Sequence, residues 1–331
     1  MHTGKAIVEV FRGQVVESRH RVHIAVAHAE QGLTACTGNP AHVSFVRSAI
    51  KMFQALPLVE EGGVERFGLT EEELAVCTAS HGGEPFHIAA ARSILAKAEL
   101  DEHDLACGPH PPMHAPSAEA LRTAGIAPSR VHNNCSGKHS GLLAYTRQRG
   151  WNTGGYHEFR HPTQQRIVAT LSQWMDVPSD DLELAVDGCG LPTFALPLDA
   201  VAYGCARFAT AAADGHPAAC RLFDAMTKHP EYVAGTDRLC SDLMRAAAGS
   251  LFAKVGAEGF YCAGVPNQRL GIAIKVEDGA TRASEPALLA TLRQLGAISD
   301  AELTVLARYA RPSVLNTRSE VVGQIQAVVR F

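Results

Sequence analysis

Two stretches near the ends of the chain alternate apolar and polar positions in the way that is typical of β-strands. Residues 6–36 contain three β-branched segments separated by glycines and polar turns, which predict two or three antiparallel strands. Residues 251–265 and 269–279 repeat this pattern on either side of a turn-like Pro-Asn-Gln, and two helical segments follow. Strand-forming segments near both ends predict that the two ends share one sheet.

The middle of the chain has a different period. From about Val43 to Ala248, apolar residues recur at the three- and four-residue spacing of helices. We therefore expect a single catalytic domain over 1–331 of the α/β (α+β) class. An antiparallel sheet would form from approximately 1–42 and 249–331, with a helical subdomain of approximately 43–248 between them and a cleft where they meet.

Composition narrows the class of function. Hydrophobic residues make up 46% of the 331 residues and charged residues 19%, which is ordinary for a folded globular protein. The net charge of −4 comes without a block of like charges, so the sequence predicts a small-molecule partner and no nucleic acid. Neither a signal peptide nor an uninterrupted membrane span is present, which predicts a cytoplasmic protein. Nine irregularly spaced cysteines predict reduced thiols.

A serine and a lysine three residues apart are the first candidates for chemistry. Ser48 and Lys51 fall on the polar side of a predicted helix that ends near Pro57. At this spacing the lysine amine can reach the serine hydroxyl, and a neutral lysine can remove its proton to make a nucleophile. Because Ser-x-x-Lys is common by chance, the motif alone does not establish catalysis, and a solvated helical face is the alternative.

A second serine and a second lysine extend this pattern. Ser80 precedes two glycines and a predicted helix start at Pro85, in a turn whose backbone N–H groups could approach a substrate; a helix-capping or turn serine is the alternative. Lys254 lies in a predicted strand flanked by glycines. The order of these motifs is partly similar to that of serine β-lactamases, penicillin-binding proteins and related glutaminases, although Val255 replaces their serine or threonine and no Ser-Asp-Asn is found.

A closer resemblance is to the class 3, rhizobial-type L-asparaginases of the asparaginase II family, which have a β-lactamase-like fold. Five segments in the family's order support it, at 45–57, 79–87, 132–141, 187–198 and 254–262. The resemblance implies two Ser–Lys tandems, Ser48 with Lys51 and Ser80 with Lys254. It also implies a homodimer.

The same resemblance implies a zinc site held by Cys135, Lys138 and Cys189. From spacing alone this site would not be predicted, because the cysteines are far apart and have no second ligand motif beside them. Four further residues are candidates for binding an amino-acid substrate: Arg47, His81, His139 and Asp187.

The sequence thus predicts hydrolysis of L-asparagine to L-aspartate and ammonia, with Lys51 as base and Ser48 as nucleophile. Ser80 and Lys254 would relay protons or activate water, or the two pairs would exchange roles. Backbone N–H groups of Ser48 and of the turn 80–83 would stabilise the oxyanion. The alternatives are a glutaminase, another β-lactamase-like serine amidohydrolase such as a penicillin-recognising acyl-transferase, and a non-enzymatic zinc-binding or redox-sensing thiol protein.

Overall fold

The computed structural model of the chain describes residues 6–331 and divides into two compact units. The sheet unit comprises the described part of Met1–Ala49 together with Ala195–Ala213 and Asp242–Phe331. The helical unit comprises Ile50–Phe194 and Asp214–Ser241. β6 (Pro192–Pro197) and α11 (Leu239–Ala246) include residues of both units.

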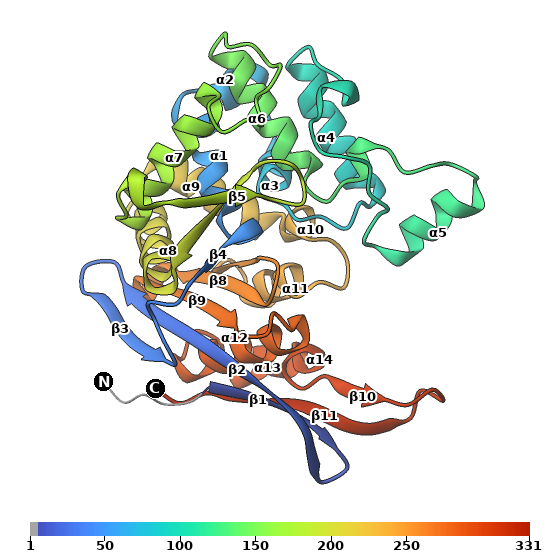
Figure 1. Ribbon diagram of the computed structural model, residues 1–331, viewed down its shortest axis with the longest axis vertical. Coiled ribbons are helices and arrows are strands. Elements are labelled where there is room, and N and C mark those ends of the chain that lie inside the picture. The colour runs from blue at the N-terminus through green and yellow to red at the C-terminus, as the bar shows by residue number, and fades with distance from the viewer. Residues whose placement is uncertain (1–5) are drawn as a thin grey trace. The chain divides into compact units, whose positions relative to one another are not determined.

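An eight-stranded antiparallel sheet is the core of the sheet unit (Figure 1). Its strand order is β10-β11-β1-β2-β9-β8-β7, and β3 pairs with β2. The strands are β1 (Ala6–Arg12), β2 (Val15–His28), β3 (Gly32–Thr37), β7 (Phe252–Val255), β8 (Phe260–Val265), β9 (Leu270–Val276), β10 (Ser313–Leu315) and β11 (Val321–Val328). β1 pairs with β11, with Ile7 opposite Val328. The prediction that both chain ends share one sheet is confirmed.

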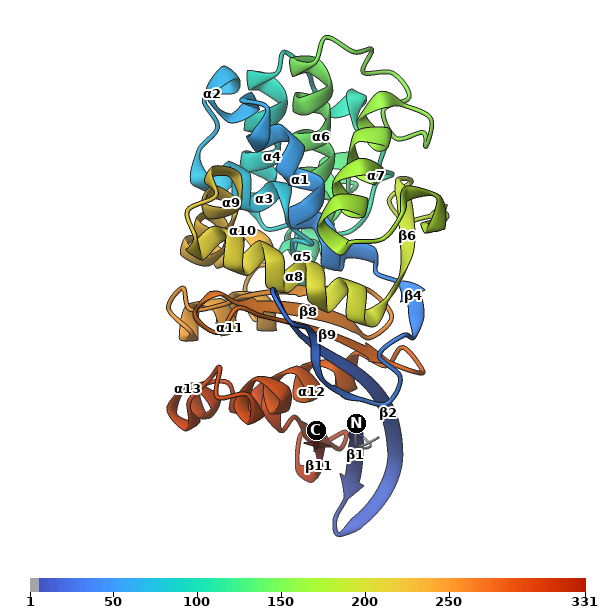
Figure 2. The same cartoon turned by 90° about the vertical axis from the view of Figure 1, so that its left-hand side faces the viewer.

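Two helices cover this sheet. α8 (Leu198–Ala213) contacts β2, β8 and β9, and α12 (Thr281–Gln294) contacts β1, β9 and β11. Figure 2 shows the strands between the two helices. Alternate residues of β1 are buried because successive side chains point to opposite faces of a strand. The unit is completed by residues 47–49 of η1 (Arg47–Ile50), by η5 (Pro266–Gln268), α13 (Asp300–Val305) and α14 (Ala307–Ala310), and by β4 (Val43–Phe45), which pairs with β6.

Helix α8 lies unusually close to the sheet where two glycines face each other. Gly264 of β8 is opposite Gly271 of β9. A Cβ atom on Gly271 would lie 2.0 Å from the carbonyl oxygen of Ala202 and 2.2 Å from the backbone nitrogen of Ala206, both in α8. Only residues without a side chain allow backbone to approach backbone this closely.

Replacing Gly271 with alanine should therefore destabilise the protein by at least about 2 kcal/mol, because the methyl group would force α8 away from the sheet. The measurement is the free energy of unfolding in urea. Gly108→Ala is the control, because no atom lies within 4 Å of a Cβ added there. Its change should stay within about 0.5 kcal/mol. Equal stability of the two variants would contradict the proposed close packing.

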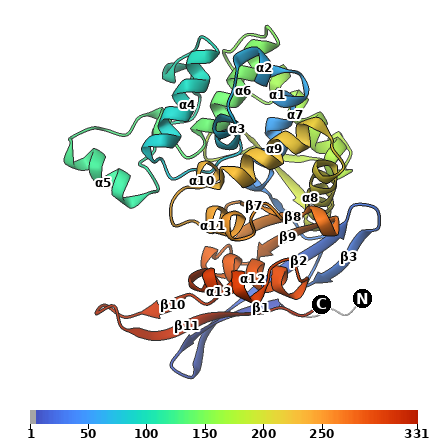
Figure 3. The ribbon, with the colours of Figure 1, turned by 180° about the vertical axis from the view of Figure 1, so that it is seen from behind.

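The helical unit is an assembly of helices packed around α1, α3 and α6 (Figure 3). Its elements are α1 (Lys51–Glu60), α2 (Gly63–Phe67), α3 (Glu71–Cys77), α4 (Pro85–Lys97), η2 (Glu102–Asp104), α5 (Ala115–Thr123), η3 (Arg130–His132), α6 (Ser136–Gln148), α7 (Pro162–Met175), η4 (Ser179–Asp181), β5 (Glu183–Val186), α9 (Pro217–Lys228) and α10 (Pro230–Val233).

The start and end of the first helix differ from the prediction. The segment opens as the 3-10 turn η1 and becomes α-helical only at Lys51, and Pro57 lies inside α1 instead of ending it. A proline in the helix lacks an N–H donor but not an acceptor, so the helix continues to Glu60, where the N–H of Glu61 still donates to the carbonyl of Pro57. The predicted start of α4 at Pro85 is confirmed.

The mixed α/β class, with an antiparallel sheet from both chain ends and helices between them in sequence, is confirmed. None of the helices formed by residues 6–331 has both the length and the apolar character needed to cross a lipid bilayer.

Candidate functional site

Lys51 is the centre of a buried polar cluster in the helical unit. It is the first residue of α1, and its side chain is fully buried. Its Nζ atom lies 3.0 Å from Ser80 Oγ and 3.1 Å from Cys135 Sγ, and it donates a hydrogen bond to the carbonyl of Ala79. The helical unit therefore brings Lys51 together with Ser80 and with one of the candidate zinc ligands.

Two glycines in α6 explain why these residues meet. A Cβ on Gly137 would lie 2.3 Å from the carbonyl oxygen of Val76, and one on Gly141 would lie 2.6 Å from Cys77 Sγ. Both contacts are with α3, so α6 packs almost backbone to backbone against it. Because Ser80 follows α3 and Cys135 precedes α6, this close packing brings the serine and the thiol to one place.

The contacts of Lys51 suit an amine without its third proton. Burial lowers the pKa of Lys51, against the opposing influence of Cys135. A neutral amine has two N–H groups and one lone pair. Two of its three neighbours, Ala79 O and Cys135 Sγ, can accept hydrogen bonds. The lone pair is then available to the hydroxyl proton of Ser80, which is the arrangement of a base beside a nucleophile.

The candidate zinc ligands form the second half of this cluster. Lys138 Nζ lies 3.1 Å from Cys189 Sγ, and the Cys135 thiol donates a hydrogen bond to Cys189. Cys135, Lys138 and Cys189 are all buried. A tight turn holds Cys189 in place, because the N–H of Asp187 donates to the carbonyl of Leu191 at 2.8 Å. The three predicted ligands are therefore neighbours in space, although the first and the last of them are 54 residues apart in the sequence.

Charge is unevenly distributed over this group. The hydrogen bond from Cys135 and the ammonium group of Lys138 lower the pKa of Cys189 to about 4, whereas the same hydrogen bond and burial raise the pKa of Cys135 to about 12. Burial alone would lower the pKa of Lys138, but Cys189 and Cys135 outweigh it and raise the pKa. Without a metal, the group is a thiolate–ammonium pair beside a neutral thiol. Over residues 6–331, no three His, Cys, Asp or Glu side chains are grouped as a metal site.

His81, next to Ser80, has both ring nitrogens engaged. Its Nδ1 accepts from the N–H of Gly83 at 3.1 Å, so Nε2 carries the proton and donates to Ser136 Oγ at 2.9 Å. Two more N–H groups of the turn that holds Ser80 are engaged in hydrogen bonds. Those of Ser80 and His81 donate to the carbonyls of Val233 and Asn134, respectively. The N–H groups of residues 80, 81 and 83 are therefore not available to an oxyanion, contrary to the expectation from sequence.

His87 stacks on His81 with ring centroids 4.9 Å apart. Its Nδ1 accepts from the N–H of Glu84 at 3.2 Å, so Nε2 donates to the carbonyl of Glu231 at 2.9 Å. The neutral ring satisfies both contacts, and burial lowers the pKa of His87 to about 4. The pair fixes the turn between Ser80 and α4.

The lowered pKa of His87 predicts that the folded protein loses stability in acid. Between pH 6.5 and about 4 the unfolded chain binds a proton at His87 that the folded chain does not, so stability falls as the pH falls. At pH 5 this difference in proton binding lowers the free energy of unfolding by about 2 kcal/mol. His87→Gln should therefore reduce the change in unfolding free energy between pH 7 and pH 5, as measured by urea denaturation. A His87→Gln variant that kept the wild-type pH dependence would contradict the assignment.

His139 has one buried ring nitrogen without a partner. Its Nδ1 lies 2.6 Å from the hydroxyl of Tyr156, and no hydrogen-bond partner for Nε2 is found in the described part of the chain. Tyr156, also buried, accepts a hydrogen bond from the N–H of Ala106 and so fixes the His139 ring. The sequence analysis did not identify Tyr156, because no motif surrounds it.

Three of the remaining predicted residues belong to the sheet unit. Arg47 and Ser48 are half-buried in η1, and Arg47 has a φ of 50°, a left-handed conformation that residues with a side chain adopt at a cost. Lys254 is fully buried on β7, the last strand of the sheet, and its Nζ donates to the carbonyl of Val255 at 3.0 Å. Asp187, in the helical unit, is half-buried beside Cys189, with its Oδ2 3.9 Å from the sulfur.

Two solved structures are similar to this chain at low sequence identity. The crystal structure of Mglu in its native form in the presence of 4.3 M NaCl is 15% identical, with a TM-score of 0.38; the match covers 84% of this chain and 61% of that chain. The octameric penicillin-binding protein homologue from Pyrococcus abyssi is 14% identical, with a TM-score of 0.33, and the match covers 83% of this chain and 73% of that one. No curated protein sequence matches.

The sequence itself matches a family model over almost its whole length. The model describes L-asparaginase II, and it matches residues 8–327. This range contains every predicted site residue, from Arg47 to Lys254. The chain therefore belongs to the L-asparaginase II family.

Proposed function

We propose that this protein hydrolyses L-asparagine to L-aspartate and ammonia with a serine nucleophile that Lys51 activates. The observation that supports this most directly is the buried 3.0 Å contact between Lys51 Nζ and Ser80 Oγ. Burial lowers the pKa of the amine, which increases the fraction of base at neutral pH. Family membership supports the amide substrate.

The chemistry follows from these groups. Lys51 takes the hydroxyl proton, and the serine oxygen attacks the side-chain amide carbon to form a tetrahedral oxyanion. Collapse of this intermediate transfers the proton to the leaving nitrogen, releases ammonia and leaves a β-aspartyl ester, which water hydrolyses. The Lys51 contact favours Ser80 as the serine that loses its proton. Ser48, three residues before Lys51 in the chain, is the alternative, with Lys254 as a second base.

The substrate contacts can be assigned in part. The unpartnered Nε2 of His139 is buried in the cluster and suits a hydrogen bond to a polar substrate group. Asp187 suits the substrate ammonium group and Arg47 its carboxylate. His81 is better suited to a structural role than to the predicted substrate contact, because both of its nitrogens are engaged.

We also propose that Cys135, Lys138 and Cys189 hold a zinc ion. Two sulfur atoms, one of them a thiolate, and an amine suit the preference of zinc for sulfur and nitrogen ligands. Lys138 would have to release its proton on binding, so zinc affinity should rise with pH. Bound zinc would supply positive charge beside the substrate pocket. We further propose a homodimer, as the family resemblance implies, and a cytoplasmic location. Sedimentation of a monomer at micromolar concentration would contradict the homodimer.

Two serine variants test the mechanism. In Ser80→Ala and Ser48→Ala, the variant that lacks the nucleophile should lose at least about 1,000-fold in steady-state ammonia release from L-asparagine. Wild-type rates in both variants would remove the serine mechanism. Absence of ammonia release from the wild-type protein would favour a non-enzymatic zinc-binding or redox-sensing protein. One methylene group changes binding by only about 1–3 kcal/mol, so the same assay must be run with L-glutamine to separate an asparaginase from a glutaminase.

A further inference from the structure

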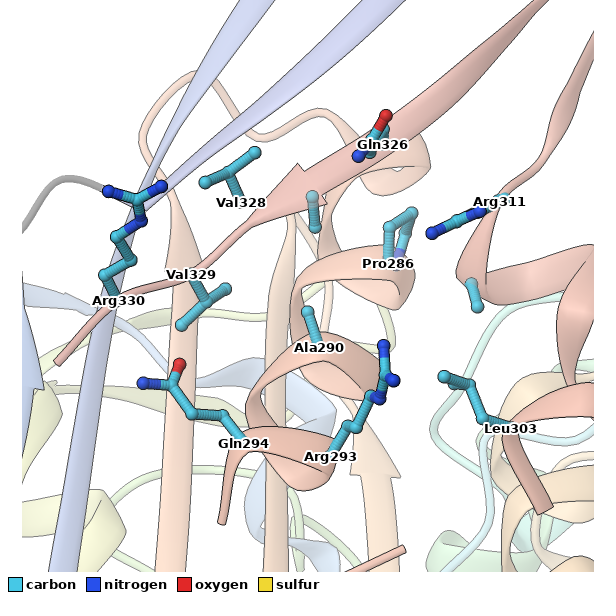
Figure 4. A pocket seen from close by; sticks show the side chains of 12 residues that line it. Pro286, Ala290, Arg293, Gln294, Leu303, Arg311, Gln326, Val328, Val329 and Arg330 are labelled. Carbon is cyan, nitrogen blue, oxygen red and sulfur yellow. The ribbon is translucent and has the colours of Figure 1, made fainter. Parts of the chain in front are cut away.

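A basic cavity lies in the sheet unit, within residues that the proposed reaction does not use. It has a volume of about 590 Å³, within the range of small-molecule sites, and lies against α12 and the end of β11 (Figure 4). Three of the twelve residues that line it are arginines and none is acidic: Pro286, Ala290, Arg293, Gln294, Leu303, Ala310, Arg311, Gln326, Ala327, Val328, Val329 and Arg330.

The arginines lie on two sides of an apolar centre. Figure 4 shows Arg293, at the end of α12, and Arg311 on one side, with Arg311 reaching toward Pro286. Arg330 lies on the other side of the cavity. Asp300 pairs with Nε of Arg293 at 2.9 Å, which leaves the other guanidinium nitrogens of Arg293 for a ligand. The cavity therefore keeps a net positive charge.

The sheet edge adds donors to the same cavity. β10 pairs with β11 only as far as Gln324, and the N–H of Ile325 then donates to the carbonyl of Pro312 on the side away from β1. N–H groups of a strand alternate in direction, so the N–H of Ala327 points to that same side. Ala327 lines the cavity. Arginine, glutamine and backbone N–H groups together suit an acceptor-rich ligand.

We propose that this cavity binds a small acid with two separated anionic groups. Guanidinium groups bind carboxylate and phosphate oxygens through paired, charge-assisted hydrogen bonds. Two basic sides require two anionic groups, and the apolar centre of proline, alanine, leucine and valine side chains suits the short carbon chain between them. The proposal depends only on the sheet unit, so it does not depend on the proposed hydrolysis.

Calorimetric titration of the full chain at low ionic strength tests it. The probes are glutarate, inorganic pyrophosphate and, as a single-charge control of similar length, butyrate. We expect saturable binding of glutarate or pyrophosphate with a Kd of about 1 mM or tighter, and binding of butyrate at least about tenfold weaker. The tighter of these two probes identifies the ligand as carboxylate or phosphate.

Three variants locate the binding. Arg311→Gln and Arg293→Gln should each weaken binding at least about tenfold. Arg318→Gln is the matched control, because Arg318 is an exposed arginine that pairs with Glu320 and does not line the cavity. It should bind the probe as the wild type does. The proposal is overturned if neither glutarate nor pyrophosphate binds saturably below about 10 mM, if butyrate binds equally well, or if Arg318→Gln weakens binding as much as Arg311→Gln.

Discussion

Replacing Lys51 with methionine should lower the rate of ammonia release from L-asparagine by at least about 1,000-fold. Methionine is similar in length to lysine and fills a buried position, but it offers no amine to take the serine proton. The buried Nζ atom lies 3.0 Å from Ser80 Oγ, and burial lowers the pKa of this amine toward the range of a working base. The loss should appear in kcat, because the missing proton transfer belongs to the chemical step.

A second lysine provides the control for this experiment. Lys97 also donates to a backbone carbonyl, that of Gly68 at 2.8 Å, and pairs with Glu73, but it belongs to no part of the cluster. Lys97→Met should therefore keep nearly full activity with some loss of stability. If Lys51→Met kept more than a tenth of the wild-type rate while remaining folded, Lys51 would not be the base.

Zinc binding should be almost abolished when Cys189 is replaced by alanine. The pKa of this thiol is lowered to about 4, so it is already a thiolate, the form that binds zinc, at neutral pH. Loss of this ligand should weaken zinc binding at least about 100-fold, since loss of an outer contact alone costs about 10–100-fold. Competition with a chromophoric chelator measures the affinity, and elemental analysis of the dialysed protein measures the stoichiometry.

Cys205→Ala is the matched control for the zinc experiment. Cys205 is also fully buried, but it lies in α8 of the sheet unit. This variant should retain one zinc ion per chain if the wild type does. A wild-type protein without stoichiometric zinc after exposure to the metal, or equal affinity in Cys189→Ala, would remove the site.

The sheet could be predicted from sequence because its signal is local. The period-two pattern predicted strands within 6–36, where β1, β2 and β3 lie, and within 251–265 and 269–279, where β7, β8 and β9 lie, and it predicted that they share a sheet. Five strands were missed: β4, β5, β6, β10 and β11. The first three have only three to six residues and lie among helical segments, which gives too few positions for a period. Pro57 was misread as a helix end, since local rules treat an internal proline as a stop.

The metal ligands and the pairing of serines with lysines in the candidate site could be predicted only through the family resemblance. Single motifs gave Ser48, Lys51 and Ser80 as candidates but not the contact between Lys51 and Ser80, which depends on how α1, α3 and α6 pack. The roles of Ser48 and Lys254 stay predictions. Tyr156 was missed, because an isolated tyrosine gives no signal until its hydroxyl is found next to His139. The bonded N–H groups at residues 80, 81 and 83 were equally invisible, because their acceptors are distant in sequence.

The glycines of α6 also affect how this protein could be stabilised. In an exposed helix, replacing glycine with alanine usually gains up to about 1 kcal/mol, so Gly137 and Gly141 would be obvious choices for engineering. Here a methyl group at either position would push α6 off α3 and separate the thiol of Cys135 from the serine that follows α3. Helical propensity and activity therefore make opposite demands on α6. Attempts to raise the melting temperature should begin at helices that take no part in the cluster.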